Sequence, residues 1–430
     1  MKAPRPLLAL LLAGCNLALP LQPPVARDSG RGDDADMSHD LAARDGTADL
    51  PPAPDIGPCP HGQRDGGDCR GLVPANIASL PPSCSDVSLL GDPIDTKTCK
   101  LTTCAGAVAP MANGADVCVL SVGRLTVSGV VKVSGPLPLV IVASGDVTIQ
   151  GTLDGAAQGE AVGPGGNPGG ESPGDVGGKD GLGAGGGKHC GCPDSNYDDC
   201  GGGGGGFGEQ GGNGGEEAGG CATKSAGGAL YGTANLEPLE GGSGGASGHN
   251  YLYMAGVNAL GAGGAGGGAL QISSQGTIRI DGAITVGGGG GQPGDGSQSA
   301  GGGGGGSGGA ILIEAVRVEG NGWLAANGGG GGGGAEVTSP GQPVATAGED
   351  GRPSGAVALG GGGGGTGTAG GAGGTGAEKP QPGGDVKTSG YGGCGGGGGA
   401  SGRIRVNLVQ KGTPFPQHSG FYTEGSPRAL

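Results

Sequence analysis

The chain has 430 residues, of which 117 are glycine and 31 are proline, and its formal net charge is −15. Aromatic residues make up only 2%, which excludes a core of the usual kind built on Phe, Tyr and Trp. The acidic balance argues against nucleic acid as a partner, because phosphate binding needs clustered Lys and Arg. Glycine loses more backbone freedom on folding than any other residue. A folded state must therefore recover that entropy from aliphatic strands, backbone hydrogen bonds and cross-links.

The opening stretch, MKAPRPLLALLLAGC, has a basic start, an apolar run and small residues before Cys15. This is the pattern of a secretory signal, too short for a mature membrane span. Leu12-Ala13-Gly14-Cys15 also resembles the lipobox of bacterial lipoproteins. That resemblance implies a lipidated Cys15 and, because Asn16 rather than Asp follows, an outer-membrane anchor with the protein on the cell surface or the periplasmic face. The alternative is an ordinary signal peptide cut near Pro20.

Residues 16–58 are rich in Pro, Asp, Arg, Ala and Gly, without helical or alternating periodicity. Such a segment cannot bury enough apolar surface to fold, so we predict a disordered tether after the signal segment 1–15. The tripeptide Arg31-Gly32-Asp33 resembles an adhesive signal, but these residue types are common throughout the tether. Chance is the better explanation for the tripeptide.

Eleven cysteines follow Cys15, and a secreted chain of this kind is normally disulfide-bonded. The candidates are Cys59, Cys69, Cys84, Cys99, Cys104, Cys118, Cys190, Cys192, Cys200, Cys221 and Cys394. The first six predict a cysteine-rich cap over residues 59–118, with a connectivity that the sequence does not fix. The odd total leaves one thiol free or paired outside the chain.

A pattern of apolar, polar, apolar, polar and Gly recurs in LTVSG, VTIQG, IRIDG and VRVEG. Alternation predicts strands with one buried face, and a glycine permits a sharp corner. The four corner glycines are Gly129, Gly151, Gly282 and Gly320.

A second strand precedes three of these copies, at 140–142, 270–272 and 311–313, and 404–406 has the pattern of a closing copy. One strand, a corner and another strand, repeated along the chain, are typical of a solenoid. We therefore predict an all-β fold over residues 119–410, a right-handed parallel β-helix or solenoid, with a C-terminal tail at 411–430.

The units GGGGGGSGGAILIEA, GAGGAGGGALQISS and GCGGGGGASGRIRVNL resemble the glycine-run-then-strand units of secreted glycine-rich bacterial lipoproteins with β-helix-like cores. The resemblance covers roughly residues 119–410. The chain also resembles the glycine-rich repeats of the mycobacterial PGRS type, although the N-terminal domain of those proteins is absent here.

Three glycine-rich insertions, at about 156–267, 288–308 and 329–400, separate the predicted strands. Composition alone describes a flexible, disordered linker. The cysteines and scattered polar residues within them favour the alternative, extended polyproline-II-like segments packed against one another.

The stretch KHCGCPDSNYDDC carries His189, Cys190, Cys192 and Cys200, which are metal-ligand types without a regular zinc spacing. Disulfides are the better interpretation in an oxidising compartment. Asp194, Asn196 and Asp198 match the first ligand positions of a calcium loop, but the sixth position lacks its glycine and the twelfth its Glu. We therefore expect no cofactor, with calcium at this loop as the alternative.

No catalytic residues are predicted. The nearby candidates for paired charges on one face are Asp281, Glu314, Arg317 and Glu319. Their pattern indicates ordinary outward-facing strand positions, and no two of the repeated strand units carry a charge at the same position. We predict a non-catalytic envelope lipoprotein with a structural, adhesive or matrix role. The expected partners are the membrane, through the anchor, and a polysaccharide or cell-surface protein. The alternative is a β-helix carbohydrate-active enzyme, a polysaccharide lyase or hydrolase.

Overall fold

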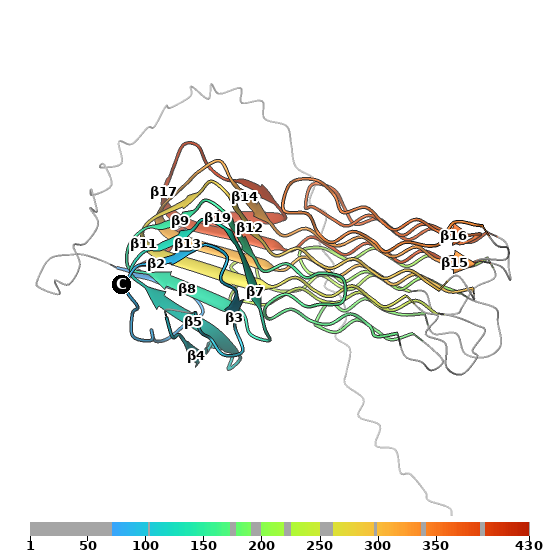
Figure 1. The fold of residues 1–430 in the computed structure, drawn as a ribbon, viewed down its shortest axis with the longest axis horizontal. Coiled ribbons are helices and arrows are strands. Elements are labelled where there is room, and N and C mark those ends of the chain that lie inside the picture. The colour runs from blue at the N-terminus through green and yellow to red at the C-terminus, as the bar shows by residue number, and fades with distance from the viewer. Residues whose placement is uncertain are drawn as a thin grey trace, which may run out of the picture. The chain divides into compact units, whose positions relative to one another are not determined.

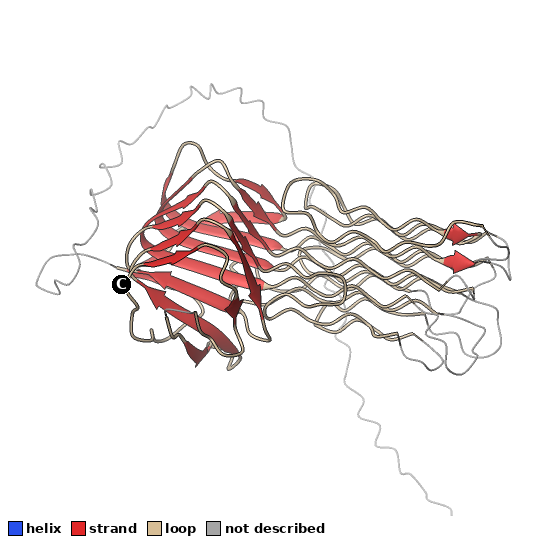
Figure 2. Ribbon diagram, viewed as in Figure 1, coloured by secondary structure: helices blue, strands red, loops and turns tan. Residues whose placement is uncertain are grey.

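A computed structural model describes residues 71–101, 104–172, 178–190, 199–218, 225–249, 261–295, 299–336, 341–387 and 392–429. All of these belong to the compact unit Ile56–Leu430. The regular elements over these ranges are all β-strands, and most strand pairs are parallel (Figures 1 and 2). The predicted all-β class is confirmed. No helix in the described ranges is long and apolar enough to cross a membrane.

The larger sheet is parallel except at one end. Its main path runs, from one edge to the other, through β19 (Phe421–Gly425), β17 (Arg403–Lys411), β13 (Ala310–Glu319), β11 (Ala269–Ile280), β8 (Leu139–Ala143), β5 (Asp116–Val122) and β4 (Ala107–Pro110). Only β4 and β5 pair antiparallel. A branch made of β2 (Val87–Leu89), β6 (Leu125–Val127) and β9 (Val147–Ile149) joins the second half of β11.

The second sheet has six parallel strands, in the order β18 (Gln417–Ser419), β14 (Trp323–Ala325), β12 (Ala283–Thr285), β10 (Thr152–Asp154), β7 (Val130–Ser134) and β3 (Ile94–Asp95). Two short pairs complete the described strands. They are β1 (Leu72–Val73) with β20 (Arg428–Ala429), and β15 (Ala335–Glu336) with β16 (Gly364–Gly365).

The core consists of ladders of aliphatic side chains that neighbouring strands hold in register. One such ladder is Leu120, Ile141, Ile272, Ile313 and Val406, all of them buried. Short alternating strands place these branched residues on one face, and each contributes about 1.5–3 kcal/mol of burial free energy. The strands predicted at 140–142, 270–272 and 311–313 lie in β8, β11 and β13, and 404–406 lies in β17.

Glycines form a second ladder at the corner between the two sheets. A Cβ added to Gly151 would lie 2.1 Å from the carbonyl oxygen of Gly129, one added to Gly282 would lie 1.8 Å from that of Gly151, and one added to Gly322 would lie 2.1 Å from that of Gly282. Gly322 therefore continues this ladder. The predicted corner residue Gly320 lies two positions earlier, with a φ of +127°, and a Cβ added to it would lie 2.0 Å from the carbonyl oxygen of Ile280, so both glycines shape the fourth corner.

The pairing of β13 with β11 explains why the ladder passes through Gly322. Val318, not Val316, lies opposite Ile278, and a register shift separates the two halves of the pair β11–β13. A shift of two residues leaves the alternation of buried and exposed positions unchanged. The sequence pattern nevertheless favours Gly320, because Val318 to Gly322 has glycine where the other copies carry their second apolar residue.

The glycine-rich segments leave the sheets at one common place. Residues 155–268, 286–309 and 326–402 each follow a strand of the six-stranded sheet and return to a strand of the larger sheet. In Figure 2 their described parts run side by side away from the sheets, as extended chain rather than as a collapsed loop. Many of their glycines are buried.

Backbone hydrogen bonds between these segments repeat every three residues. In the stretch 301–309, successive amide groups donate to three neighbours in turn. The acceptors are His249, Cys394 and Gln292, then Ala246, Gly397 and Gly289, then Ser243, Ala400 and Val286. Three further segments donate to carbonyl groups of the same stretch, through Gly202, Gly264 and Gly329 among others. One segment is thus hydrogen-bonded to six neighbours.

Close packing explains why the residue has to be glycine. A Cβ added to Gly304 would lie 2.1 Å from the carbonyl oxygen of Gly203, and one added to Gly305 would lie 2.2 Å from that of Gly329. Both contacts are with backbone atoms, which other segments hold in place. We call the described parts of the three segments the glycine bundle.

Both ends of the core are covered. At the β3 end, the disulfides Cys84–Cys104 and Cys99–Cys118 join residues that pack on the core, with Cα–Cα distances of 5.8 and 5.3 Å. At the other end, Phe415 and Tyr422 lie partly buried against it.

The aliphatic ladder gives a first prediction. Ile280 is 0% exposed, so Ile280→Asp places an uncompensated charge in the core, at a cost of about 3–5 kcal/mol. Val130→Asp is the matched control, because Val130 is 64% exposed. We expect rapid proteolysis of the first variant and wild-type resistance of the second. Equal resistance of both variants would contradict this account of the core.

The bundle gives a second prediction. Gly304→Ala should destabilise the protein by about 1–3 kcal/mol or more, because the added methyl group overlaps backbone on a neighbouring segment. Gly362→Ala is the control, since its Cβ would approach only the Thr346 hydroxyl, at 3.7 Å. It should be neutral or stabilise by about 0.4–1 kcal/mol, through the unfolded state. Chemical denaturation measures both changes, and similar values for the two would contradict the packing argument.

Candidate functional site

At the far end of the glycine bundle, where β15 and β16 lie in Figure 1, are its described cysteine and histidine side chains and several of its carboxyl groups. Backbone bonds place these groups together. The amide of His249 donates to the carbonyl of Cys200 at 2.9 Å, and the carbonyl of His249 accepts from Gly301 at 3.0 Å. The amide of Cys394 donates to the carbonyl of Asp199 at 2.8 Å. Segments far apart in sequence thus meet in one cluster.

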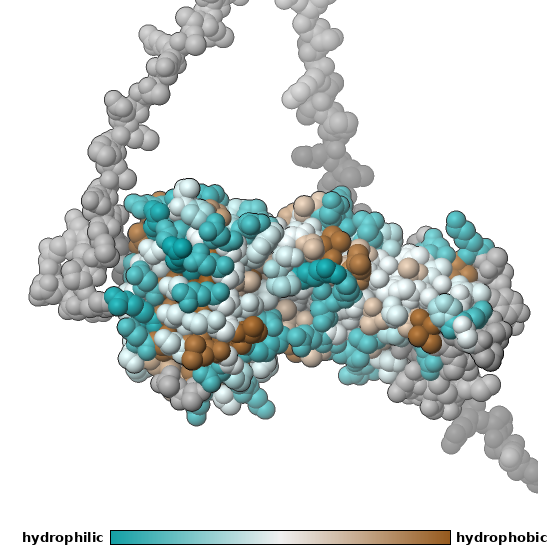
Figure 3. Space-filling view, turned by 45° about the horizontal axis from the view of Figure 1, so that its top comes forward, coloured by the Kyte–Doolittle hydropathy of each residue, from teal (hydrophilic) through white to brown (hydrophobic). Residues whose placement is uncertain are grey.

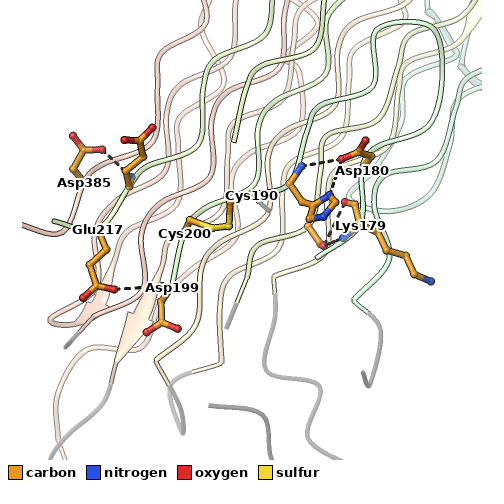
Figure 4. The surroundings of a disulfide bond; sticks show 10 residues. Lys179, Asp180, Cys190, Asp199, Cys200, Glu217 and Asp385 are labelled. Atoms are coloured by element: carbon orange, nitrogen blue, oxygen red, sulfur yellow. Dashed lines mark hydrogen bonds and ion pairs between the residues drawn. A yellow bond between two sulfur atoms is a disulfide. The ribbon is translucent and has the colours of Figure 1, made fainter. Parts of the chain in front are cut away.

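A disulfide between Cys190 and Cys200 lies at the centre of this end (Figure 4). Its two Cα atoms are 6.5 Å apart, and the cysteines are 2% and 4% exposed. The sulfur atoms and a ring nitrogen of His249 all lie within 4.8 Å of one another. The bond joins two glycine segments, and the imidazole comes from a third.

On one side of the disulfide, Asp180 organises the chain around His189. Its carboxylate accepts from the His189 amide at 3.0 Å, contacts the His189 Nδ1 at 2.7 Å and binds the Lys188 ammonium at 2.9 Å. Partial burial opposes ionisation, but the hydrogen bonds from Lys188 and His189 outweigh it and lower the pKa of Asp180 below its ordinary value. His189 is thereby held by Asp180, although it is adjacent in sequence to Cys190.

On the other side lie a thiol and three carboxyl groups. Asp199 and Glu217 are buried, and the Asp199 amide contacts the Glu217 carboxylate at 3.4 Å. Burial raises the pKa of the Cys394 thiol to about 12, and the charges of Glu217, Asp199 and Asp385 add to the shift. Cys394 is therefore a neutral thiol at pH 7, and such a thiol is a poor nucleophile.

The candidate cysteines divide into three groups in the structure. Six form the disulfides Cys84–Cys104, Cys99–Cys118 and Cys190–Cys200. Cys394 is a free thiol, which differs from its prediction as a disulfide candidate. The reason is that the other described cysteines are paired with one another, and glycine segments enclose its side chain. Cys15, Cys59, Cys69, Cys192 and Cys221, and the calcium candidates Asp194, Asn196 and Asp198, lie outside the described residues.

The charged strand residues weighed as catalytic candidates occupy two different environments. Asp281 and Glu319 form ion pairs with Arg279, at 2.6 and 3.4 Å, and Glu319 also pairs with Arg317 at 2.8 Å. These are partly exposed contacts along the outside of β11 and β13. Such pairs contribute little stability.

Glu314 was expected to face outward from the protein, but it is fully buried. Its carboxylate accepts from the Ala75 amide at 2.9 Å, Gln271 at 3.0 Å, Ser273 at 2.8 Å and Asn407 at 3.3 Å. The network joins residues far apart in the chain, since Ala75 lies 239 positions away from Glu314, so no local pattern predicts the whole of it. A signal in the sequence is the pair of polar residues Gln271 and Ser273, which alternate with the apolar Leu270 and Ile272 in β11. The network fastens residues 72–77 over the outer face of the larger sheet.

The chain matches no family model, and neither the curated proteins nor the solved structures contain a match to it.

The environment of Cys394 gives a third prediction. Because the thiol is buried and its pKa is about 12, a maleimide at pH 8 should label it at least about 100-fold more slowly in the native protein than in urea, where a thiol pKa is about 8.5. Site-resolved mass spectrometry of labelled peptides measures this ratio. Equal labelling rates at Cys394 in the two states would contradict the position assigned to the thiol.

Proposed function

We propose that this chain is a non-catalytic lipoprotein of the cell envelope, anchored in the outer membrane through Cys15 and serving a structural or adhesive role. The observation that carries the proposal is the glycine bundle. It joins three insertions into one hydrogen-bonded body and places their described cysteine and histidine residues at the end away from the sheets. Such a body is suited to presenting a surface at a distance from the part of the chain that is tethered.

We further propose that the strands form a right-handed parallel β-helix. Support comes from the repeated order of strands, in which β8, β9 and β10 pair in register with the two halves of β11 and with β12. The corner ladder of Gly129, Gly151 and Gly282 has the spacing that a stacked turn requires. The right hand follows from the general rule for crossovers between parallel strands of one sheet.

The glycine bundle, in this proposal, consists of polyproline-II-like segments. A polyproline II helix has three residues per turn, and the hydrogen bonds of 301–309 change neighbour with that period. Every third residue then faces the same neighbour. Because each amide and carbonyl is directed at another segment, the bundle is stiff without a hydrophobic core of its own.

The surface is consistent with a polar partner. In the view of Figure 3, the glycine bundle is mostly pale, with small, separate hydrophobic patches and scattered hydrophilic residues. Large contiguous apolar patches usually mark protein or membrane contact sites. A polysaccharide or a polar cell-surface protein is the class of partner that fits such a surface.

Protease shaving of intact cells tests the proposal and gives a fourth prediction. Wild-type protein should remain in the membrane fraction and be cut from outside, whereas Cys15→Ala should appear in the soluble fraction, because it lacks the thiol that carries the lipid. A periplasmic marker that stays uncut controls for leakage.

Two results would change the proposal. A Cys15→Ala protein that remains in the membrane fraction contradicts the lipid anchor. Wild type that intact cells protect from protease contradicts the adhesive role and leaves scaffolding inside the envelope.

A further inference from the structure

We propose that Cys190, Cys200 and His249 form a redox-controlled site for a thiophilic metal ion, with Zn²⁺ as the probe, that becomes available when the disulfide is reduced. The three groups are brought together by the glycine bundle and not by a sequence motif. In the sequence, His249 lies 49 positions after Cys200.

The donor set has the chemistry that such an ion requires. Thiolate and imidazole are the ligands that Zn²⁺ takes in proteins, at about 2.3 Å for sulfur and 2.0–2.1 Å for nitrogen. Tetrahedral coordination at those lengths places the ligand atoms roughly 3.4–3.8 Å apart. In the structure the two sulfur atoms and the imidazole nitrogen lie within 4.8 Å of one another. Small side-chain rotations after reduction are enough to form the site.

The backbone holds the three ligands in place independently of the disulfide. The Cys200 carbonyl accepts from the His249 amide at 2.9 Å. The Lys188 carbonyl, two residues before Cys190, accepts from Gly203 at 3.1 Å, and the Lys188 amide donates to Ala226 at 2.9 Å. Reduction therefore leaves the segments aligned, and a preorganised site loses little entropy on binding.

His189 is the obvious sequence candidate for the imidazole ligand, but it has a different role. Its Nδ1 lies 2.7 Å from Asp180, whose carboxylate also binds Lys188. Its substitution should leave the cluster intact, which makes it a matched control for His249.

The redox step balances as follows. A dithiol or phosphine reductant supplies two electrons, and two protons complete the conversion of the Cys190–Cys200 disulfide into two thiols. Binding of Zn²⁺ then displaces the two thiol protons, because the metal binds thiolates. The complex of one dication with two thiolates and a neutral imidazole carries no net charge, which suits its buried position.

The experiment uses the full chain with Cys192→Ser, so that a neighbouring thiol outside the described residues does not contribute. Zn²⁺ affinity is measured by chelator competition before and after reduction with a phosphine, and Co²⁺ is added separately to detect thiolate coordination by its charge-transfer absorption. Circular dichroism of the reduced protein verifies that the strands persist. Three further variants, Cys200→Ser, His249→Ala and His189→Ala, are compared in that background.

We expect reduced protein to bind Zn²⁺ at least about 100-fold more tightly than oxidised protein. Loss of a residue that only hydrogen-bonds to a metal ligand lowers affinity by about 10–100-fold, and the disulfide removes two ligands themselves. Cys200→Ser and His249→Ala should each remove this binding and the Co²⁺ absorption, while His189→Ala keeps both. Unchanged affinity in His249→Ala, or equal affinity of the oxidised and reduced forms, would overturn the proposal. So would loss of binding in His189→Ala alone. None of these outcomes depends on where the protein is anchored.

Discussion

Contact between backbones without intervening side chains is the constraint on which the rest of the structure depends. In the glycine bundle an amide of one segment meets a carbonyl of the next at 2.8–3.1 Å throughout the stretch around 301–309, and a single methyl group at Gly304 would overlap a neighbouring backbone. The usual entropic disadvantage of glycine is offset because each segment satisfies its polar backbone against several neighbours. The bundle obtains its cohesion from hydrogen bonds, as the sheets do, but in several directions rather than two.

The sheets determine where the bundle begins. Each glycine-rich insertion follows β10, β12 or β14 and ends at β11, β13 or β17, and these strands are neighbours in their sheets. The insertions therefore start and finish next to one another, already aligned for pairing. Stacked aliphatic ladders such as Ile141, Ile272 and Ile313 supply the hydrophobic stability that fixes this alignment. Residues such as Phe207 and Tyr231, with ring centroids 4.5 Å apart, join the base of the bundle to the outer face of the larger sheet.

The far end of the bundle carries cysteine, histidine and acidic side chains in addition to glycine. This end holds the Cys190–Cys200 disulfide, His249, the Asp180–His189 contact and the buried Cys394. A body built almost wholly from backbone thus carries its described cysteine and histidine side chains at one place, and the proposed display role and the proposed metal site both depend on that arrangement.

The sequence by itself determined the all-β class, the positions of the aliphatic strands and the limits of the glycine-rich insertions, because alternation and composition are local properties. It also identified the cysteines that cross-link the core end. It placed the fourth corner at Gly320, whereas the ladder of stacked corner glycines continues through Gly322, because Val318 and not Val316 pairs with Ile278. Only the tertiary structure decided that Glu314 is buried beneath residues 72–77, that Cys394 is a free thiol and that His249, not His189, lies against the disulfide. Those three facts depend on which glycine segments and strands become neighbours, and that choice is made by backbone pairing between positions tens to hundreds of residues apart, where identical glycines carry no signal of their partner.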